Sequence, residues 1–265
     1  MEKKGITNKK YKDTVFRLLF NNKKEALVLY NNLYDANYTD ESLIEIVTLE
    51  DVLFTPRKND IAFTMDGRFM VLLEHQSTIN ENMPLRFLIY IARLYEKIVD
   101  VDNIYKRRFI KIPSPEFVVL YNSHDNLVKY GEVVTELELD LSDAFRDCSD
   151  TQLELKVRVI DICYSSHNKV VAKNDTLGQY SRFIQIVDDC KNIEWNLYEA
   201  MKMAVNMAIE NNILTDFLKQ HSSEVRNMIT LEYNEEIAKR VEREENREEG
   251  REQGRAEGRD NKKMP

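Results

Sequence analysis

Residues 59–76 of the chain read NDIAFTMDGRFMVLLEHQ, and this stretch decides the fold. Two strand-like runs, 59–65 and 68–76, flank the dipeptide Asp66-Gly67. An Asp-Gly pair between two such runs is a strong signal for a β-hairpin. The stretch therefore predicts two antiparallel strands joined by a tight turn.

The second strand of this hairpin is apolar at every position from 69 to 73 (FMVLL). A strand that is apolar on both faces is buried on both, so it is expected in the interior of a sheet. Glu74 and Gln76 follow at its end and share one face, because side chains alternate with a period of two. A buried carboxylate is costly unless it is paired or bound to a metal, so Glu74 marks a candidate site.

The turn decides whether Asp60, at the start of the first strand, joins this site. A two-residue loop would pair Asp60 with Leu73 and point it away from Glu74. A three-residue loop (residues 65–67), with its glycine in the left-handed conformation, would pair Asp60 with Leu72 and place it diagonal to Glu74 on the same face. A shift of one residue thus separates a shared site from two unrelated carboxylates, and the sequence leaves both open.

The rest of the chain predicts an α/β fold with a mixed-sheet core flanked by helices and a helical C-terminal half. Apolar spacing over residues 11–35 predicts two helices that break at Asn21-Asn22. Pro84 begins another helix, whose apolar stripe is expected to pack on the body. The stripe is Leu85, Leu88, Ile89, Ala92, Tyr95 and Val99, with Arg86, Tyr90, Arg93 and Lys97 on the other side. Further strands are expected at 43–48, 117–121 and 157–162, and helices at 176–190, 194–212 and 213–229.

By composition the 265 residues divide into three parts. Residues 1–170 are expected to form a catalytic core, and residues 171–230 a helical C-terminal region. Residues 231–265 form a charged extension, in which Arg/Glu/Gly units repeat every four residues from Asn246. Each glycine there weakens a helix by about 1 kcal/mol relative to alanine. We expect a solvated, partly disordered segment without a packed core.

Composition also excludes several classes of protein. The three cysteines are widely spaced and form no CxxC pair, so neither a zinc knuckle nor a disulfide framework is expected. No run reaches the roughly 18 apolar residues of a membrane-spanning helix, and the N-terminus lacks a signal peptide's apolar run. A soluble, cytoplasmic protein is expected. The net charge is −8, so a nucleic-acid binder of this composition must use a local basic surface.

Asp60 and Glu74 together would suit Mg²⁺, which binds one or two protein carboxylates along with waters and phosphate oxygens. Such an ion would polarise a phosphodiester and lower the pKa of a bound water. Gln76 can hydrogen-bond that water, but it cannot supply positive charge or lose a proton. From these residues alone, a salt-bridged strand end is the alternative interpretation.

Five segments carry a family resemblance: residues 11–17 (YKDTVFR), 59–61 (NDI), 74–77 (EHQS), 83–90 (MPLRFLIY) and 115–121 (PEFVVLY). In this order they resemble the recombination-promoting nuclease / putative transposase family, a branch of the PD-(D/E)XK nuclease superfamily. The resemblance covers about residues 11–165. Its most specific part is the Glu-His-Gln-Ser segment followed by the arginine-containing helix. The Arg/Glu/Gly extension also recurs in that family.

The resemblance implies a restriction-endonuclease-like core and magnesium-dependent hydrolysis of DNA phosphodiesters, linked to recombination, mobile elements or phage defence. It places the metal-binding acid at Asp60 and the second acid at Glu74. It also places Gln76 where the superfamily motif carries lysine, a departure that the family shares. Asp13 matches a family position that either completes the catalytic site or caps a helix.

His75 lies between two site residues and therefore faces the other side of the strand, so a packed histidine is expected rather than a general base. Candidate DNA contacts lie on the helix that Pro84 begins and in the basic cluster after it. They are Arg86, Arg93, Lys97, Lys106, Arg107 and Arg108, with Lys111 close by. A solvated charged surface is the alternative interpretation of these cations.

Two functions follow from these observations. The first is a magnesium-dependent DNA endonuclease. The second is a catalytically weak or inactive DNA-associated binding or assembly protein of the same fold, which Gln76 and the acidic net charge favour. A homo-oligomer is compatible with both, and no residue indicates the strand transfer of a true transposase.

Overall fold

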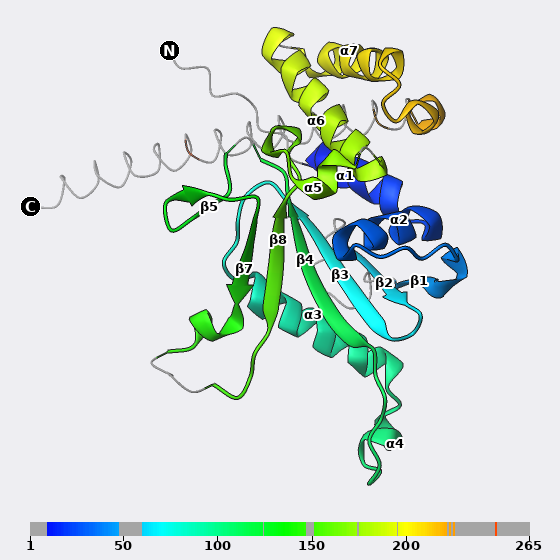
Figure 1. The fold of residues 1–265 in the computed structure, drawn as a ribbon, viewed down its shortest axis with the longest axis vertical. Helices are drawn as coiled ribbons and strands as arrows, with labels where there is room; N and C mark the ends of the chain where they lie inside the picture. The colour runs from blue at the N-terminus through cyan, green and yellow to red at the C-terminus, as the bar shows by residue number, and fades with distance from the viewer. Residues whose placement is uncertain are drawn as a thin grey trace, which may run out of the picture.

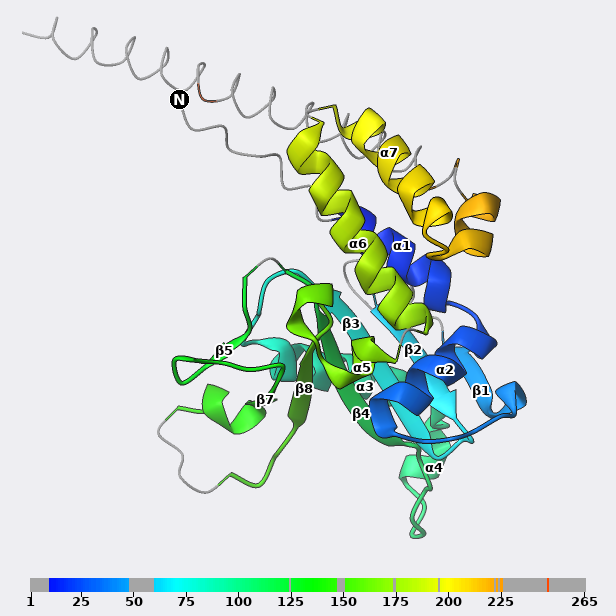
Figure 2. The ribbon, with the colours of Figure 1, turned by 45° about the horizontal axis from the view of Figure 1, so that its top comes forward.

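The computed structural model describes residues 10–47, 60–123, 125–146, 151–173, 175–194 and 196–221, together with Ser223, Val225 and Arg247. In these ranges the chain forms a mixed α/β fold, in which helices cover both faces of a twisted sheet (Figures 1 and 2). The sheet separates two hydrophobic cores, one shared with the N- and C-terminal helices and one shared with α3. The predicted α/β class is therefore confirmed.

The described strands of the main sheet form the order β1-β2-β3-β4-β8-β7. Their bounds are β1 (Ile44–Val47), β2 (Asp60–Met65), β3 (Phe69–Gln76), β4 (Ser114–Tyr121), β8 (Lys156–Asp161) and β7 (Glu136–Asp140). β4 pairs in parallel with β3 and with β8, and the other pairs are antiparallel. The interior position predicted for β3 is confirmed. The short strands β5 (Val128–Lys129) and β6 (Glu132–Val133) form a separate hairpin.

The N-terminal helices are α1 (Lys10–Phe20) and α2 (Lys23–Tyr34), followed by the 3-10 turn η1 (Glu41–Leu43). The helix break predicted at Asn21-Asn22 is confirmed. The side chain of Asn22 accepts a hydrogen bond from the backbone of Glu25 at 3.0 Å and so caps α2. Both helices bury aromatic or aliphatic side chains in the core that they share with α6.

Helix α3 (Met83–Ile98) begins beside Pro84 as predicted, but the predicted packing face is wrong. The buried residues are Met83, Pro84, Phe87, Tyr90, Ile91 and Leu94. Leu85 and Ile89 of the expected stripe are 45% and 49% exposed, and Tyr90, expected on the outer side, is buried. The reason is aromatic packing: the ring of Phe87 lies 5.2 Å from that of Phe117 on β4, and large aromatic rings bury more apolar surface.

Between α3 and β4 lies the short helix α4 (Val101–Ile104), and the 3-10 turns η2 (Leu141–Ala144) and η3 (Tyr164–Ser166) flank β8. After β8 follow α5 (Lys169–Ala172), α6 (Thr176–Ile193) and α7 (Leu197–Glu210). α6 and α1 contribute to one core, because Tyr180 packs edge-on against Phe16 with ring centroids 5.6 Å apart. The predicted helix at 213–229 is described only in part. The extension at 231–265 lies outside the described residues except Arg247.

No helix in the described ranges is long and apolar enough to cross a membrane. Cys163 and Cys190 carry free thiols, the former half-buried and the latter buried. Cys148 lies outside the described residues.

Candidate functional site

The β2–β3 ladder places Asp60 directly opposite Glu74. Both expected pairings of Asp60, with Leu73 and with Leu72, are therefore wrong. The loop has three residues, but they are 66–68 rather than 65–67, since Met65 pairs with Phe69. In consequence, positions 60 and 74 share one face of the sheet as directly opposed neighbours rather than as a diagonal pair.

The turn explains this register. Asp66 and Gly67 both adopt left-handed backbone conformations, with φ of 53° and 62°, and the Arg68 N–H donates to the Met65 carbonyl at 3.0 Å. The Arg68 carbonyl accepts a hydrogen bond from the Ser114 N–H of β4 at 2.7 Å. The Arg68 carbonyl is thus bonded to β4. On β3 the β2–β3 ladder begins at Phe69, one residue later than in a hairpin whose loop is Asp66-Gly67 alone.

Gln76 lies on the α3 side of the sheet, where its Nε2 atom donates to the sulfur of Met83 at 2.9 Å. Strand alternation places positions 60 and 74 on the same side, together with Ala62, which belongs to the core beneath α3. The side chains of Asp60 and Glu74 lie outside the described part of the structure, so their placement rests on the backbone register.

A surface hollow of about 670 Å³ opens at the C-terminal end of β3. Asp13 of α1, His75 and Gln76 of β3, Arg86 of α3 and the loop 77–82 line it. We call it the strand-end hollow. Three of the residues predicted from sequence, Asp13, Gln76 and Arg86, are thus brought to one place by three different elements.

Asp13 is held in the strand-end hollow by His75. The Nδ1 atom of His75 lies 2.7 Å from Oδ1 of Asp13, and its Nε2 atom lies 3.1 Å from the hydroxyl of Tyr180. That hydroxyl also donates to the Lys12 carbonyl at 3.0 Å. Because a carboxylate only accepts, Nδ1 donates to Asp13. The prediction of a packed His75 on the face away from Gln76 is confirmed.

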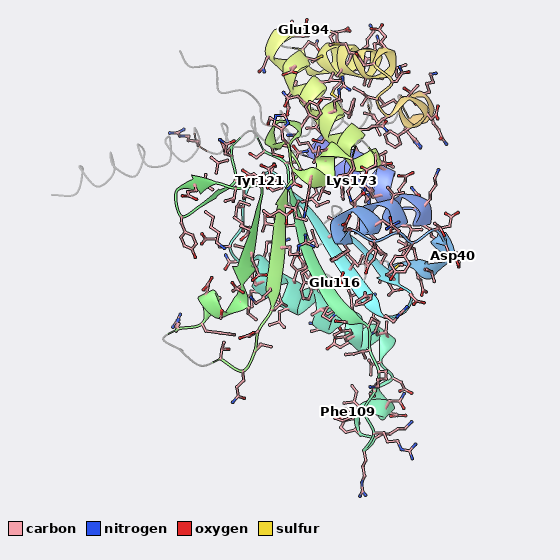
Figure 3. The ribbon with its side chains drawn as sticks, viewed as in Figure 1. Asp40, Phe109, Glu116, Tyr121, Lys173 and Glu194 are labelled. Carbon is pink, nitrogen blue, oxygen red and sulfur yellow. The ribbon has the colours of Figure 1, made fainter. Side chains whose placement is uncertain are left out.

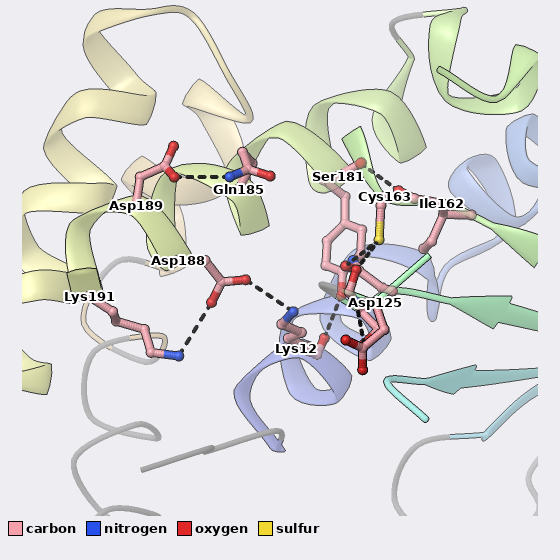
Figure 4. Close-up of polar contacts among 12 residues, drawn as sticks. Lys12, Asp125, Ile162, Cys163, Ser181, Gln185, Asp188, Asp189 and Lys191 are labelled. Carbon is pink, nitrogen blue, oxygen red and sulfur yellow. Dashed lines mark hydrogen bonds and ion pairs between the residues drawn. The ribbon is translucent and has the colours of Figure 1, made fainter. Parts of the chain in front are cut away.

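A buried ion pair fastens α1 to α6 next to this contact. The ammonium of Lys12 lies 3.2 Å from Asp188, and Asp188 also lies 3.3 Å from Lys191 (Figure 4). Removing one partner of a buried pair leaves an uncompensated charge, so such pairs fix the elements that carry them. Since Lys12 precedes Asp13 directly, the pair also fixes the turn of α1 that presents Asp13.

The neighbouring strand ends carry a second polar cluster. The Asn122 N–H donates to the Gln76 carbonyl at 2.8 Å, and the Cys163 thiol donates to the Ser123 carbonyl at 2.7 Å. Burial raises the pKa of the Cys163 thiol to about 12, and burial also raises the pKa of Asp161, whose Oδ1 accepts from the Cys163 N–H at 2.8 Å. Burial therefore disfavours the charged form of each group, and their hydrogen bonds tie the ends of β4 and β8 together.

The predicted DNA-contacting cations divide into two groups. Arg86, Arg93 and Lys97 follow one flank of α3, where Arg86 bonds the Tyr90 hydroxyl at 3.0 Å and Arg93 pairs with Glu96 at 3.1 Å. Lys106, Arg107 and Arg108 are exposed and lie near the start of β4, at the opposite end of the sheet from the strand-end hollow. The structure thus brings only Arg86 to the hollow.

Several contributing residues were not identified from sequence. No local sequence motif marks Tyr180 or Asp188. Each of them contacts a residue of α1 that lies more than 160 positions away in the sequence. Lys12 stands beside Asp13 in the YKD segment, which is the one signal that could have indicated it. Among the side chains that the structure describes, no three His, Cys, Asp or Glu groups converge as a metal site.

Comparison of the chain with protein-family models, with curated proteins and with solved structures finds no match. The family resemblance of the five sequence segments therefore stays a prediction.

Proposed function

We propose that the chain is a magnesium-dependent DNA endonuclease with a restriction-endonuclease-like core. The observation that carries the proposal is the register that sets Asp60 directly opposite Glu74, on the face that also holds Gln76. Cβ atoms of directly opposed residues lie about 4.5–5.5 Å apart, a separation at which two carboxylates can share one cation. Two acids of this kind would otherwise repel each other, so a divalent cation accounts for their pairing.

The donor set fits a hard cation, because carboxylate and amide oxygens are ligands that Mg²⁺ prefers. Mg²⁺ held by Asp60 and Glu74 would polarise a phosphodiester and lower the pKa of a bound water. Asp13, fixed by its bond to His75, adds a carboxylate that can orient a water at the edge of the strand-end hollow. Arg86 lines the same hollow and would pair with a phosphate oxygen.

A row of cations supports a polyanionic substrate. Arg86, Arg93 and Lys97 are spaced by seven and four residues, or about 10 Å and 6 Å along the axis of α3. Because Arg86 lines the strand-end hollow, the row leads from the hollow along one flank of the helix. The net charge of −8 makes such a local basic row the surface through which DNA would be bound.

The second candidate is a DNA-binding or assembly protein with little catalysis. The observation that favours it is the environment of Gln76, which is buried and donates to the sulfur of Met83. A neutral amide at this position cannot stabilise developing negative charge as a lysine does. The two candidates differ in whether purified protein cleaves DNA.

Nicking of supercoiled plasmid in the presence of Mg²⁺ tests the proposal. We expect the parent to convert plasmid to the nicked form with Mg²⁺ and to stop when EDTA is added. Asp60→Asn and Glu74→Gln should abolish nicking. Glu45→Gln is the matched control, since Glu45 is an exposed strand glutamate opposite Thr64 and should not affect the rate. Parental nicking by Asp60→Asn would exclude this site, and DNA binding by a parent that cannot nick would favour the second candidate.

A further inference from the structure

Two aromatic side chains are exposed to solvent on a segment that projects from the body. Residues 105–111 follow α4 and extend away from the end of the sheet where β4 begins (Figures 1 and 3). Phe109 is 98% exposed and Tyr105 is 84% exposed. We call residues 105–111 the basic projection. Burying such exposed rings against the flat apolar faces of a partner would stabilise a complex.

The C-terminal end of the basic projection is fastened to the body. The hydroxyl of Tyr95 on α3 donates to the Pro113 carbonyl at 2.6 Å, and the Ser114 N–H donates to the Arg68 carbonyl at 2.7 Å. At its N-terminal end the projection follows α4, which Asp100 caps by accepting from the Asp102 N–H at 3.1 Å. The body therefore fixes the point at which the projection returns to β4.

The basic projection also has a charge opposite to that of the whole chain. Lys106, Arg107, Arg108 and Lys111 give it four cations, and its seven residues, YKRRFIK, include no acid. The chain as a whole carries −8. Cations that flank exposed aromatic rings match a partner that presents both negative charge and flat π faces, which is the chemistry of a nucleic-acid strand with unstacked bases.

We propose that the basic projection binds single-stranded or locally unpaired DNA. Phe109 and Tyr105 stack on bases, and the four cations contact the flanking phosphates. The inference deepens the proposed function and rests on it for the identity of the nucleic acid. What it adds is the form of DNA that the protein recognises.

An anionic membrane surface is the competing partner, because it too attracts cations that stand beside aromatic residues. The row of cations on α3 favours a nucleic-acid partner over a membrane. Arg86, Arg93 and Lys97 continue from the strand-end hollow along the helix toward the end of the sheet that bears the basic projection. A line of cations follows a strand of phosphates, whereas a membrane is contacted by a patch at one end of a molecule.

The basic projection is far from the proposed catalytic residues. It joins β4 at Ser114, which pairs with Phe69 at the first residue of β3, whereas Gln76 is the last. Seven steps of about 3.3 Å separate these ends by about 23 Å. The projection therefore contributes to DNA binding and not to bond cleavage, and its variants should change KM rather than kcat.

The test measures binding of fluorescein-labelled DNA in EDTA, so that cleavage plays no part. The probes are a single-stranded 20-mer, its duplex, and vesicles of phosphatidylserine and phosphatidylcholine. We expect the parent to prefer the single strand, and Phe109→Ala to weaken that binding about tenfold, the typical loss for one stacked base. Tyr130→Ala is the matched control, because Tyr130 is 96% exposed and lies on the β5–β6 turn. This variant should bind the single strand with the same affinity as the parent.

Charge is tested with Lys106→Gln/Arg107→Gln, which should weaken binding and lower its salt dependence by about two phosphate contacts. Lys23→Gln/Lys24→Gln removes two exposed cations from α2 and serves as the control. An effect of Phe109→Ala below twofold, or one seen with vesicles and not with DNA, overturns the inference. If Phe109→Ala weakens DNA binding while the parent never nicks plasmid, the inference stands and the proposed nuclease activity fails.

Discussion

His75 joins Asp13 and Tyr180 across the middle of the molecule: its two ring nitrogens lie 2.7 Å from the Asp13 carboxylate and 3.1 Å from the Tyr180 hydroxyl. One buried side chain thereby connects β3 with α1 and α6, directly beside Gln76. The end of β3 that bears the proposed site cannot shift without breaking these contacts.

The first prediction concerns this connection. His75→Ala should lower the free energy of unfolding by about 2–4 kcal/mol, because it removes two buried hydrogen bonds and the packing of the ring against Phe16. Tyr180→Phe keeps the contact between His75 and Asp13 and should cost about 1 kcal/mol. Urea denaturation of the single and double variants at positions 13 and 75 should give a coupling energy of about 1–3 kcal/mol. Additive effects would show that the two side chains do not interact in solution.

The second prediction concerns the opposed acids. Asp60 and Glu74 occupy directly opposed positions of the ladder, and like charges in such positions destabilise a sheet. Without metal, Glu74→Gln should be at least as stable as the parent, because it removes one charge and keeps the shape. Mg²⁺ should raise the melting temperature of the parent, by mass action, and should not raise that of the variant. An equal Mg²⁺-induced rise in both proteins would place the cation elsewhere.

Gln76→Lys extends this reasoning to the departure from the superfamily motif. A lysine would place positive charge beside the two acids, so stability without metal should rise. Mg²⁺ affinity should fall, because the ammonium repels the cation. Thermal melting over a Mg²⁺ titration measures both effects, and tighter Mg²⁺ binding by the variant would contradict the placement of Gln76 beside the acids.

The fourth prediction is a pH dependence at Asp161. Burial raises the pKa of this carboxyl in the folded protein, so its ionisation opposes folding. Its contribution is fully favourable below the unfolded pKa and is lost as the pH rises through the folded pKa. Asp161→Asn retains an oxygen that can accept from the Cys163 N–H. The variant should therefore be more stable than the parent at pH 7, and the difference should shrink toward pH 3 in chemical denaturation.

The fifth prediction concerns the charged extension. Deleting residues 246–265 should leave the melting temperature almost unchanged, because their sequence offers no apolar face to bury. Differential scanning calorimetry of the truncated and full chains is the measurement. A drop of several degrees would mean that the extension packs on the body.

Much of the fold could be predicted because its signals are local. The Asp-Gly turn, the strand apolar on both faces and the helix break capped by Asn22 depend on residues within a few positions of one another. These signals were sufficient to predict the hairpin, the interior position of β3 and the placement of His75 and Gln76 on opposite faces of the sheet. Alternation along a strand needs no knowledge of what lies on either side of it.

The tertiary structure decided the features that depend on distant partners. The hairpin register follows from the Arg68 carbonyl, which bonds Ser114 46 positions along the chain. The buried face of α3 follows from the ring of Phe117, because two apolar faces were available and only one meets an aromatic partner. Asp13 reaches the end of β3 only because α1 packs there. Sequence determines which side chains can pair, but long-range packing energies determine which of them do.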